Sequence, residues 1–410
     1  MHEAGQGGLN LNEKDILAIN GGKPVRDKLL PYGHQCIDKD DIKAVIDVLC
    51  SDWLTTGPKV VEFEERFAEA VGAKYAVAVN SGTAALHAAA FAAGIGQNDE
   101  VITTPMTFAA SANCVLYIGG RPIFADVEAD TLLLDPFSVE SKISPKTKAI
   151  IAVDYAGQPC DYDALKEISD RYGLVLIADA CHALGATYKG RKVGTLADMT
   201  VFSFHPVKHI TTGEGGMIVT DNPDFAAKLR IFRNHGITTD HRQREAGGSW
   251  FYEIVELGYN YRLPDINCAL GMSQLEKLDK FVARRRQIAA FYDSAFADTI
   301  ALSPLAQHDD RMSSYHLYVV KLRLNKLNAD RSRFFAALRA ENIGVNVHYI
   351  PVYWHPYYRK LGYEKGLCPV AEKSYEEIIT FPLFPAMSDR DVGDVVQAVK
   401  KVLDTQGIKI

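Results

Sequence analysis

The chain has 410 residues, a hydrophobic fraction of 47% and a formal net charge of −6 at pH 7. This length exceeds that of one ordinary hydrophobic core, so we expect two domains within one subunit. The lysines and arginines are scattered and no apolar run is long enough to cross a membrane, so neither nucleic acid nor a membrane is expected as a partner.

The N-terminal segment is polar up to Asp15. It lacks the basic stretch followed by an apolar stretch that marks a secretory signal, so we expect residues 1–18 to be a disordered leader. The character of the sequence changes again beyond Leu263. We therefore assign residues 19–263 to a large domain with an N-terminal segment, and residues 264–410 to a linking helix and a small C-terminal domain.

Apolar strands alternate with helical stretches between Tyr75 and Thr220. This alternation is typical of an α/β fold with a mostly parallel sheet and helices on both faces. Within and before this region, helices are expected at 40–49, 60–71, 84–93 and 162–172. Further on, we expect a long helical stretch at 264–297 and then a smaller α+β part with a strand at 314–324 and helices at 331–343 and 398–407.

A polar turn follows the first apolar run, where Ser81, Gly82 and Thr83 precede an alanine-rich helix. Backbone amides at a helix N-terminus, with hydroxyl groups beside them, can hold a phosphate. Such a turn is also ordinary punctuation between a strand and a helix. Phe108 follows the next strand, where its ring could stack on a flat cofactor, although most aromatic rings in this position are merely core.

Asp179 ends the apolar run of the segment LVLIADACHALG, which reads as a buried parallel strand. An acid at such a strand end faces the crevice in which open α/β sheets bind ligands, and it could pair with a cationic ring nitrogen. A helix N-cap is an equally good reading of this aspartate. His182 could lie over the same ring, or it could be an ordinary half-buried histidine.

Lys208 lies in the segment TVFSFHPVKHITTGEGG, in a loop between two predicted core strands. A buried lysine amine has a lowered pKa and becomes nucleophilic near neutral pH, as a Schiff base with pyridoxal phosphate (PLP) requires. Ser203 and Thr211 could offer hydroxyl groups to a phosphate beside it. A solvated surface lysine is the alternative, but the position of the loop between core strands weighs against it.

The seven cysteines form no CxxC pair, and their odd number argues against a complete set of disulfides. A reducing cytoplasm is therefore the expected location. Cys181 lies close to Asp179 and His182, but no spaced cysteine or histidine completes a tetrahedral site. We expect no metal.

Several ordered segments carry a resemblance to a known family. Besides the three segments around Ser81, Asp179 and Lys208, they include INGGKPVR, WLTTGPKVVEFEERFA, RNHGI, GYNYRLPDINCALGMSQL, HYIPVY and FPLFP. In this order they resemble the PLP-dependent sugar aminotransferases of the DegT/DnrJ/StrS type, over nearly the whole chain. The resemblance implies the fold of type I PLP-dependent aminotransferases.

The resemblance also implies roles for individual residues. Lys208 is similar to the lysine that carries PLP, Asp179 to the partner of the pyridine nitrogen, His182 to the neighbour of the ring oxygen and Phe108 to the stacking aromatic. The cofactor phosphate would be held by Ser81, Gly82, Thr83 and Ser203 and, from the opposite subunit of a homodimer with shared active sites, by Asn260. Substrate contacts by likeness are Tyr32, Asp52, Trp53, Leu54, Thr55, Arg262, His348, Tyr349 and Tyr353.

Within the family, the chain most resembles the aminotransferase of pseudaminic acid biosynthesis. The features behind this choice are VDYAG at 153–157, DACHALGATYKGRKVG at 179–194 and HITTGEGG at 209–216. The implied reaction transfers an amino group from L-glutamate to C4 of a UDP-linked 4-keto-6-deoxy-N-acetylhexosamine, giving UDP-4-amino-4,6-dideoxy-N-acetyl-β-L-altrosamine. Ping-pong kinetics are expected.

Other functions stay open at this point. A GDP- or dTDP-linked 4-ketosugar of the perosamine type is a possible substrate, and a non-catalytic PLP-binding regulator is a further alternative. A dehydratase of the same family would carry histidine in place of Lys208, which argues against that reading. A nicotinamide-dependent oxidoreductase would need a GxGxxG motif after the first strand, and this chain lacks it.

Overall fold

The computed structural model describes residues 16–239, 244 and 246–406. The expected disordered leader therefore lies outside the described residues up to Asp15, whereas its last three residues, 16–18, are ordered, because Leu17 is fully buried and Ala18 begins a 3-10 turn. The strands are β1 (Tyr75–Val79), β2 (Glu100–Thr103), β3 (Arg121–Phe124), β4 (Thr147–Val153), β5 (Val175–Asp179), β6 (Thr187–Tyr188), β7 (Arg191–Lys192), β8 (Met199–Ser203), β9 (Gly216–Thr220), β10 (Leu302–Pro304), β11 (Arg311–Met312), β12 (Tyr318–Leu322) and β13 (Ile378–Phe381).

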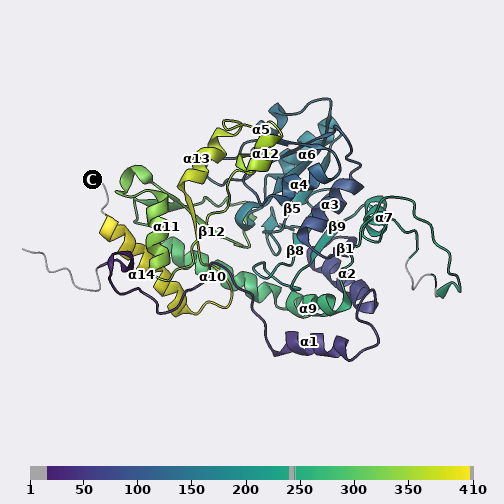
Figure 1. Cartoon of the computed structure of the whole chain (residues 1–410), viewed down its shortest axis with the longest axis horizontal. Coiled ribbons are helices and arrows are strands. Elements are labelled where there is room, and N and C mark those ends of the chain that lie inside the picture. Colours follow the sequence, from purple (N-terminus) through teal and green to yellow (C-terminus); the bar gives the residue numbers. More distant parts are fainter. Residues whose placement is uncertain (1–15, 240–243, 245, 407–410) are drawn as a thin grey trace, which may run out of the picture.

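The helices surround these strands (Figure 1). They are α1 (Lys39–Leu49), α2 (Pro58–Val71), α3 (Gly82–Ala92), α4 (Ala110–Tyr117), α5 (Pro136–Ser141), α6 (Tyr162–Tyr172), α7 (Pro223–Phe232), α9 (Asp265–Leu275), α10 (Leu278–Phe296), α11 (Arg331–Ala340), α12 (Pro356–Lys360), α13 (Pro369–Glu377) and α14 (Asp389–Gln406). The four helices expected before residue 173 agree with α1, α2, α3 and α6 to within two residues at each end. No helix among the described residues is long and apolar enough to cross a membrane.

A seven-stranded sheet in the order β1-β9-β8-β5-β4-β2-β3 forms the centre of the large part. Its strands run parallel except β9, which is antiparallel to both of its neighbours. The expectation of an α/β fold with a large, mostly parallel sheet is confirmed. Because the other strands run in one direction, the loops that follow β1, β2, β4, β5 and β8 meet at one edge of the sheet.

Both faces of this sheet are buried, and successive residues of each strand face opposite ways. In β1, Val77 and Val79 pack into the cluster that contains the alanines of α3 and Leu229 of α7. Ala76 and Ala78 face the other cluster, with Phe63 and Phe67 of α2. Burial on both faces explains why these strands are continuous apolar runs in the sequence.

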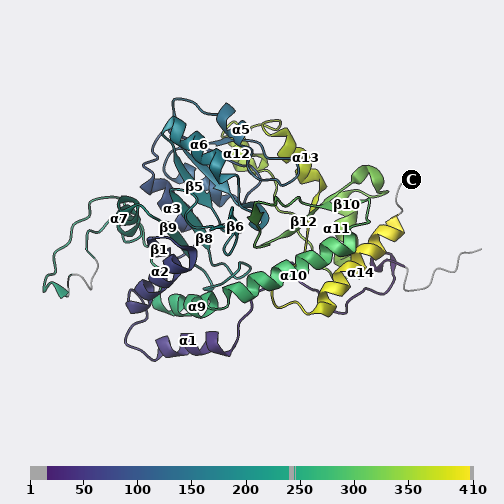
Figure 2. The ribbon, with the colours of Figure 1, turned by 180° about the vertical axis from the view of Figure 1, so that it is seen from behind.

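The expected helical stretch at 264–297 is two helices in the structure. Helix α9 ends at Leu275 and α10 begins at Leu278. At the break, the Lys277 ammonium pairs with the buried carboxylate of Asp41 at 2.9 Å, while Gln274 of α9 donates to the same carboxylate at 2.7 Å. These contacts hold the α9 end against α1. Helix α10 then runs on to the smaller part of the molecule (Figure 2).

The smaller part contains the antiparallel sheet β10-β12-β13, packed with α10, α11 and α14 around a cluster of its own. The N-terminal segment joins this cluster through Leu17 and Leu30, and the Ala18 amide donates to Glu341 at 2.8 Å. Strand β12 begins four residues later than the expected 314–324, because the amides of Ser314 and Leu317 donate to residues 157 and 156 instead of to a neighbouring strand.

Candidate active site

A cavity of about 550 Å³ opens at the edge of the large sheet where the parallel strands end. Its walls come from the loops after β1, β2, β5 and β8 and from two segments of the smaller part, around His316 and at 346–349. The lining residues are Tyr32, Ser81, Gly82, Thr83, Leu86, Thr107, Phe108, Ala110, Ser111, Val153, Asp179, Cys181, His182, Ser203, His205, Val207, Lys208, Glu214, His316, Asn346, Val347, His348 and Tyr349.

The N-terminus of α3 forms one end of this cavity. Ser81 caps the helix, since its hydroxyl accepts a hydrogen bond from the Ala84 amide at 3.0 Å. A Cβ atom on Gly82 would lie 2.8 Å from Ser203 Cβ, so only glycine lets the helix end approach this strand end so closely. First-turn amides have no acceptor within the helix, and with the hydroxyls of Thr83 and Ser203 nearby they suit a phosphate.

Asp179 lies at the end of β5 and is 5% exposed. Its Oδ2 accepts a hydrogen bond from the Ser111 hydroxyl at 2.6 Å, and its Oδ1 accepts one from the Cys181 amide at 3.2 Å. In the part of the chain that the structure describes, no lysine or arginine forms an ion pair with this carboxylate. It is held in place and free to pair with a cationic group of a ligand, as PLP requires.

Lys208 stands half-buried in the cavity, and its Nζ lies 3.4 Å from Nε2 of His316. Burial lowers the pKa of its amine. The charge of Asp179 opposes this shift, and that of Arg285 adds to it. A lowered pKa makes the free amine more available for attack on a carbonyl carbon and for proton transfer.

His182 lines the same cavity as Asp179 and Lys208. Its Nε2 is 3.2 Å from the Tyr349 hydroxyl, and its Nδ1 is buried without a partner among the described residues. Burial, and then the nearby Lys208, lowers the pKa of His182 well below its usual value. The ring is therefore neutral near pH 7.

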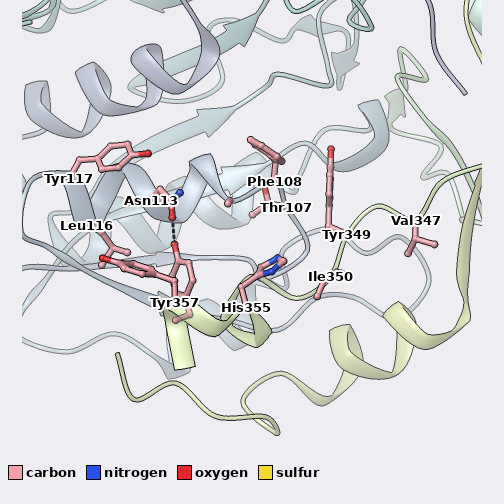
Figure 3. Close-up of a pocket in the computed structure, with 12 residues that line it drawn as sticks. Thr107, Phe108, Asn113, Leu116, Tyr117, Val347, Tyr349, Ile350, His355 and Tyr357 are labelled. Carbon is pink, nitrogen blue, oxygen red and sulfur yellow. Dashed lines mark hydrogen bonds between the residues drawn. The ribbon is translucent and has the colours of Figure 1, made fainter. Parts of the chain in front are cut away.

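Phe108 presents its ring to this cavity and is 63% exposed. An exposed aromatic face beside the carboxylate suits a flat cofactor ring. Figure 3 shows Phe108 beside Tyr349, at a second pocket of about 610 Å³ that shares these two residues, Thr107 and Val347 with the first. In that second pocket the Tyr358 hydroxyl donates to Asn113 at 2.6 Å.

Three of the expected substrate contacts line the first cavity, namely Tyr32, His348 and Tyr349. The His348 ring is fixed by Thr380 at 2.9 Å and by the Asn346 amide at 3.2 Å. Burial lowers the pKa of His348 to about 3, so this ring is neutral and acts through hydrogen bonds rather than through charge.

The structure does not bring Tyr353 to the cavity. Its side chain is fully buried, its hydroxyl donates to Glu372 at 2.6 Å, and its ring packs on Phe124. Four residues after Tyr349 the chain has entered the 3-10 turn Val352–Trp354, which directs the side chain of Tyr353 into the core. In this structure Tyr353 is a packing residue.

The remaining expected residues lie away from this cavity within the same chain. Asp52, Trp53 and Leu54 are exposed between α1 and α2. Thr55 and Arg262 line another pocket, also of about 550 Å³, where Arg262 donates to Asn234 at 2.7 Å. Asn260 is exposed and its carbonyl accepts a hydrogen bond from Asn80, the residue before Ser81.

Several lining residues were missed by reasoning from the sequence, above all Ser111 and His316. Ser111 had a detectable signal, because it falls in the first turn of the helix that follows Phe108. His316 had none, since it lies within a run that reads as a strand. Among the described residues, no three side chains of His, Cys, Asp or Glu gather in an arrangement that could hold a metal ion.

Comparisons with known proteins agree with this geometry. A model of the DegT/DnrJ/EryC1/StrS aminotransferase family matches residues 35–400. The spore coat polysaccharide biosynthesis protein SpsC of Bacillus subtilis is 44% identical over 381 residues, which cover 92% of this chain and 98% of SpsC.

Two solved structures are similar over the same share of the chain. The putative sugar aminotransferase Spr1654 from Streptococcus pneumoniae, in its PMP form, has a TM-score of 0.87 and 35% identity, with 92% of this chain and 99% of that chain covered. Helicobacter pylori PseC, an aminotransferase involved in the biosynthesis of pseudoaminic acid, has a TM-score of 0.86 and 33% identity, with 92% and 100% covered.

Spr1654 has also been solved in a PLP form, with a TM-score of 0.86. The family, the aminotransferase activity and the PLP cofactor expected from the sequence are thereby confirmed. The chain belongs to the DegT/DnrJ/EryC1/StrS aminotransferase family of PLP-dependent enzymes.

Proposed function

We propose that this chain is a sugar aminotransferase that transfers the amino group of L-glutamate to C4 of a UDP-linked 4-keto-6-deoxy-N-acetylhexosamine. The observation that carries the proposal is the meeting of Lys208 and Asp179 in one cavity. Its substrate class is supported by the similarity to PseC over 92% of this chain, and by the resemblance of the segments around Asp154, Asp179 and Lys208 to the pseudaminic acid branch.

The cavity fits PLP at each of its chemical groups. The α3 N-terminus, with Ser81, Gly82, Thr83 and Ser203, would hold the phosphate, and Asp179 would pair with the ring nitrogen. The remaining contacts would come from Phe108 against the ring face, His182 at the ring oxygen and Lys208 at the aldehyde carbon. When bound, PLP supplies an electron sink for the pair released at a substrate carbon.

The protein's own residues handle the protons and exclude water. Lys208 Nζ would remove the α-proton of glutamate in the first half of the reaction and deliver a proton to C4 of the sugar in the second. Tyr32, His348 and Tyr349 line the same cavity and would orient the sugar. Because the amino group stays in the site after 2-oxoglutarate leaves and before the ketosugar binds, ping-pong kinetics are expected.

We also propose a homodimer in which Asn260 and Arg262 complete the partner's site. Both lie outside the Lys208 cavity of their own chain. The described residues of the segment after α7, 233–239 and 246–257, project from the body of the molecule (Figure 1), and they expose large apolar side chains, with Trp250 85% and Leu257 78% exposed. Such a surface is typical of an interface. Sedimentation should give twice the 45.2 kDa mass of one chain, and a monomer would contradict this arrangement.

A cytoplasmic location is part of the same proposal. All seven cysteines are free, including four that are buried, which suits a reducing compartment. Fractionation of cells that express a tagged chain would test it, and recovery of the protein outside the cytoplasm would contradict it.

A panel of nucleotide sugars tests the substrate. The purified enzyme would be loaded with PLP and given L-glutamate and a UDP-, GDP- or dTDP-linked 4-ketosugar, and the products would be measured by mass spectrometry. We expect an amino sugar and one equivalent of 2-oxoglutarate from the UDP-linked N-acetylhexosamine, and none with Lys208→Ala. Product from only the GDP- or dTDP-linked sugars would refute the proposed substrate while leaving the aminotransferase activity intact.

A further inference from the structure

A histidine from the smaller part of the molecule lies beside the reactive lysine. His316 precedes β12, is 5% exposed, and places its Nε2 at 3.4 Å from Lys208 Nζ. The proposed reaction assigns no role to this side chain. A buried ring at hydrogen-bond distance from a reacting nitrogen is in a position to affect each proton transfer at that nitrogen.

The surroundings of His316 are basic. The His182 ring lies 4.3 Å away between centroids and the His209 ring 5.8 Å away, and Arg285 donates to the His316 carbonyl. Burial, followed by the charge of Lys208, lowers the pKa of His316 well below its usual value. The ring is therefore neutral, and a neutral imidazole can accept a hydrogen bond from an ammonium group rather than repel it.

The other ring nitrogen, Nδ1, is buried without a hydrogen-bond partner among the described residues. A buried polar atom without a partner is uncommon and calls for an explanation. A neutral imidazole carries one proton, so an acceptor role for Nε2 places that proton on Nδ1. The contact with Lys208 through Nε2 is then the one side-chain hydrogen bond of this ring among the described residues.

One buried arginine fixes the backbones of both partners. The guanidinium of Arg285, on α10, donates to the carbonyls of Tyr315 and His316 at 3.2 Å each and to the carbonyl of Leu383 at 3.0 Å. It also reaches the carbonyl of Val207, the residue before Lys208, at 3.4 Å. The loop that carries the lysine and the segment that carries the histidine are therefore joined through one rigid group.

We propose that His316 is a further catalytic residue, whose Nε2 accepts a hydrogen bond from Lys208 Nζ whenever the lysine carries the transferred proton. This role rests on the proposed function of Lys208. When the free amine removes the α-proton of the donor, the Cα–H bond breaks, its electron pair stays on the carbon side, and an Nζ–H bond forms. The resulting ammonium donates one N–H group to His316 and keeps another for return to the substrate. Arg285 is a positioning residue that holds the pair together.

The acceptor role is tested first without the cofactor. The rate at which an amine-selective acylating reagent modifies Lys208 in the apoenzyme, followed by peptide mapping across pH, reports the pKa of the amine. Because an acceptor stabilises the ammonium form, His316→Phe should lower the midpoint by about one pH unit. His316→Gln, whose amide oxygen can replace Nε2, should keep the midpoint of the native protein. Equal midpoints in all three proteins would overturn the proposal.

The second readout is the half-reaction with L-glutamate in single-turnover experiments on the PLP-loaded enzyme. We expect about a 100-fold slower reaction with a larger isotope effect from α-deuterated glutamate in His316→Phe, and a reaction within about fivefold of native in His316→Gln. His308→Phe, at a surface histidine that contacts Glu128, is the matched control and should change neither readout. Equal slowing in the Gln and Phe variants would assign His316 a purely structural role.

These measurements separate this proposal from that of the substrate, because neither requires a nucleotide sugar. If His316→Phe does not fold, as judged by its thermal midpoint, His316→Asn replaces it. The shorter amide of asparagine does not reach the position of Nε2, so the Gln and Asn variants should differ in the labelling midpoint. If they do not differ, the proposal fails.

Discussion

Two aspartates at neighbouring strand ends of the large sheet have different environments. Asp179 ends β5, and Asp154 directly follows β4, with its amide donating to the Asp179 carbonyl at 3.1 Å. Asp179 lines the cavity and has a hydrogen bond at each carboxylate oxygen. Asp154 is fully buried, and its Oδ2 has no partner among the described residues.

The difference shows how one residue type serves two purposes at the same edge of a sheet. Burial, to which the charge of Asp179 adds, raises the pKa of Asp154 to about 7. A carboxyl group that keeps its proton up to neutral pH adds no second negative charge beside Asp179. The Asp179 carboxylate therefore faces the cavity without a second negative charge at the neighbouring strand end.

Replacement of Asp179, the member of this pair that lines the cavity, should have the largest effect. Asp179→Asn keeps the shape of the side chain but carries no charge to stabilise a protonated ring nitrogen, so we expect kcat to fall by about three orders of magnitude or more. Steady-state kinetics with saturating PLP measure this. Turnover within tenfold of native would remove Asp179 from its assigned role, and an unchanged thermal midpoint would show that the fold is intact.

Replacement of Asp154, the member of the pair that does not line the cavity, should change how the stability of the protein depends on pH. The carboxyl group has a folded pKa of about 7, above the 3.8 of the unfolded chain, so its contribution to stability is present below about pH 4 and lost as pH rises towards 7. Asp154→Asn does not titrate. The free energy of unfolding of the variant minus that of the native protein should therefore rise by on the order of 2 to 4 kcal/mol from pH 4.5 to pH 7.5.

Urea unfolding of the two proteins at these two pH values measures the change, and the remaining groups cancel in the difference. The amide can still accept from the Cys160 amide and the Tyr162 hydroxyl, which now bond to Oδ1 at 2.9 Å and 2.8 Å. A constant difference between the two proteins at both pH values would show that Asp154 is ionised in the folded state.

The part of the cavity that is formed by residues at the ends of the parallel strands could be predicted from the sequence. Asp179, Ser203 and Lys208 each follow an apolar run, and buried parallel strands deliver the residues that follow them to one edge. His316 could not be predicted in this way. Its position depends on bonds between its segment and residues 156 and 157, about 160 positions earlier in the chain, and no local pattern records such a pairing. The break between α9 and α10 also depends on a distant contact, with Asp41 of α1.

Tyr349 and Tyr353 differ in the same way as the two aspartates, since one lines the cavity and the other packs in the core. The expected effect of replacing Tyr353 is smaller than that of replacing either aspartate. Tyr349 lines the cavity and contacts His182, whereas the Tyr353 hydroxyl donates to Glu372 and accepts from the Cys368 amide at 3.1 Å in the core. Tyr353→Phe should therefore lower the free energy of unfolding by about 1 kcal/mol and leave kcat and KM within about twofold of native. Chemical unfolding and steady-state kinetics measure these quantities. A raised KM with an unchanged free energy of unfolding would contradict this prediction. It would place the Tyr353 hydroxyl in contact with the substrate, because a lost substrate contact changes KM and not the stability of the free protein.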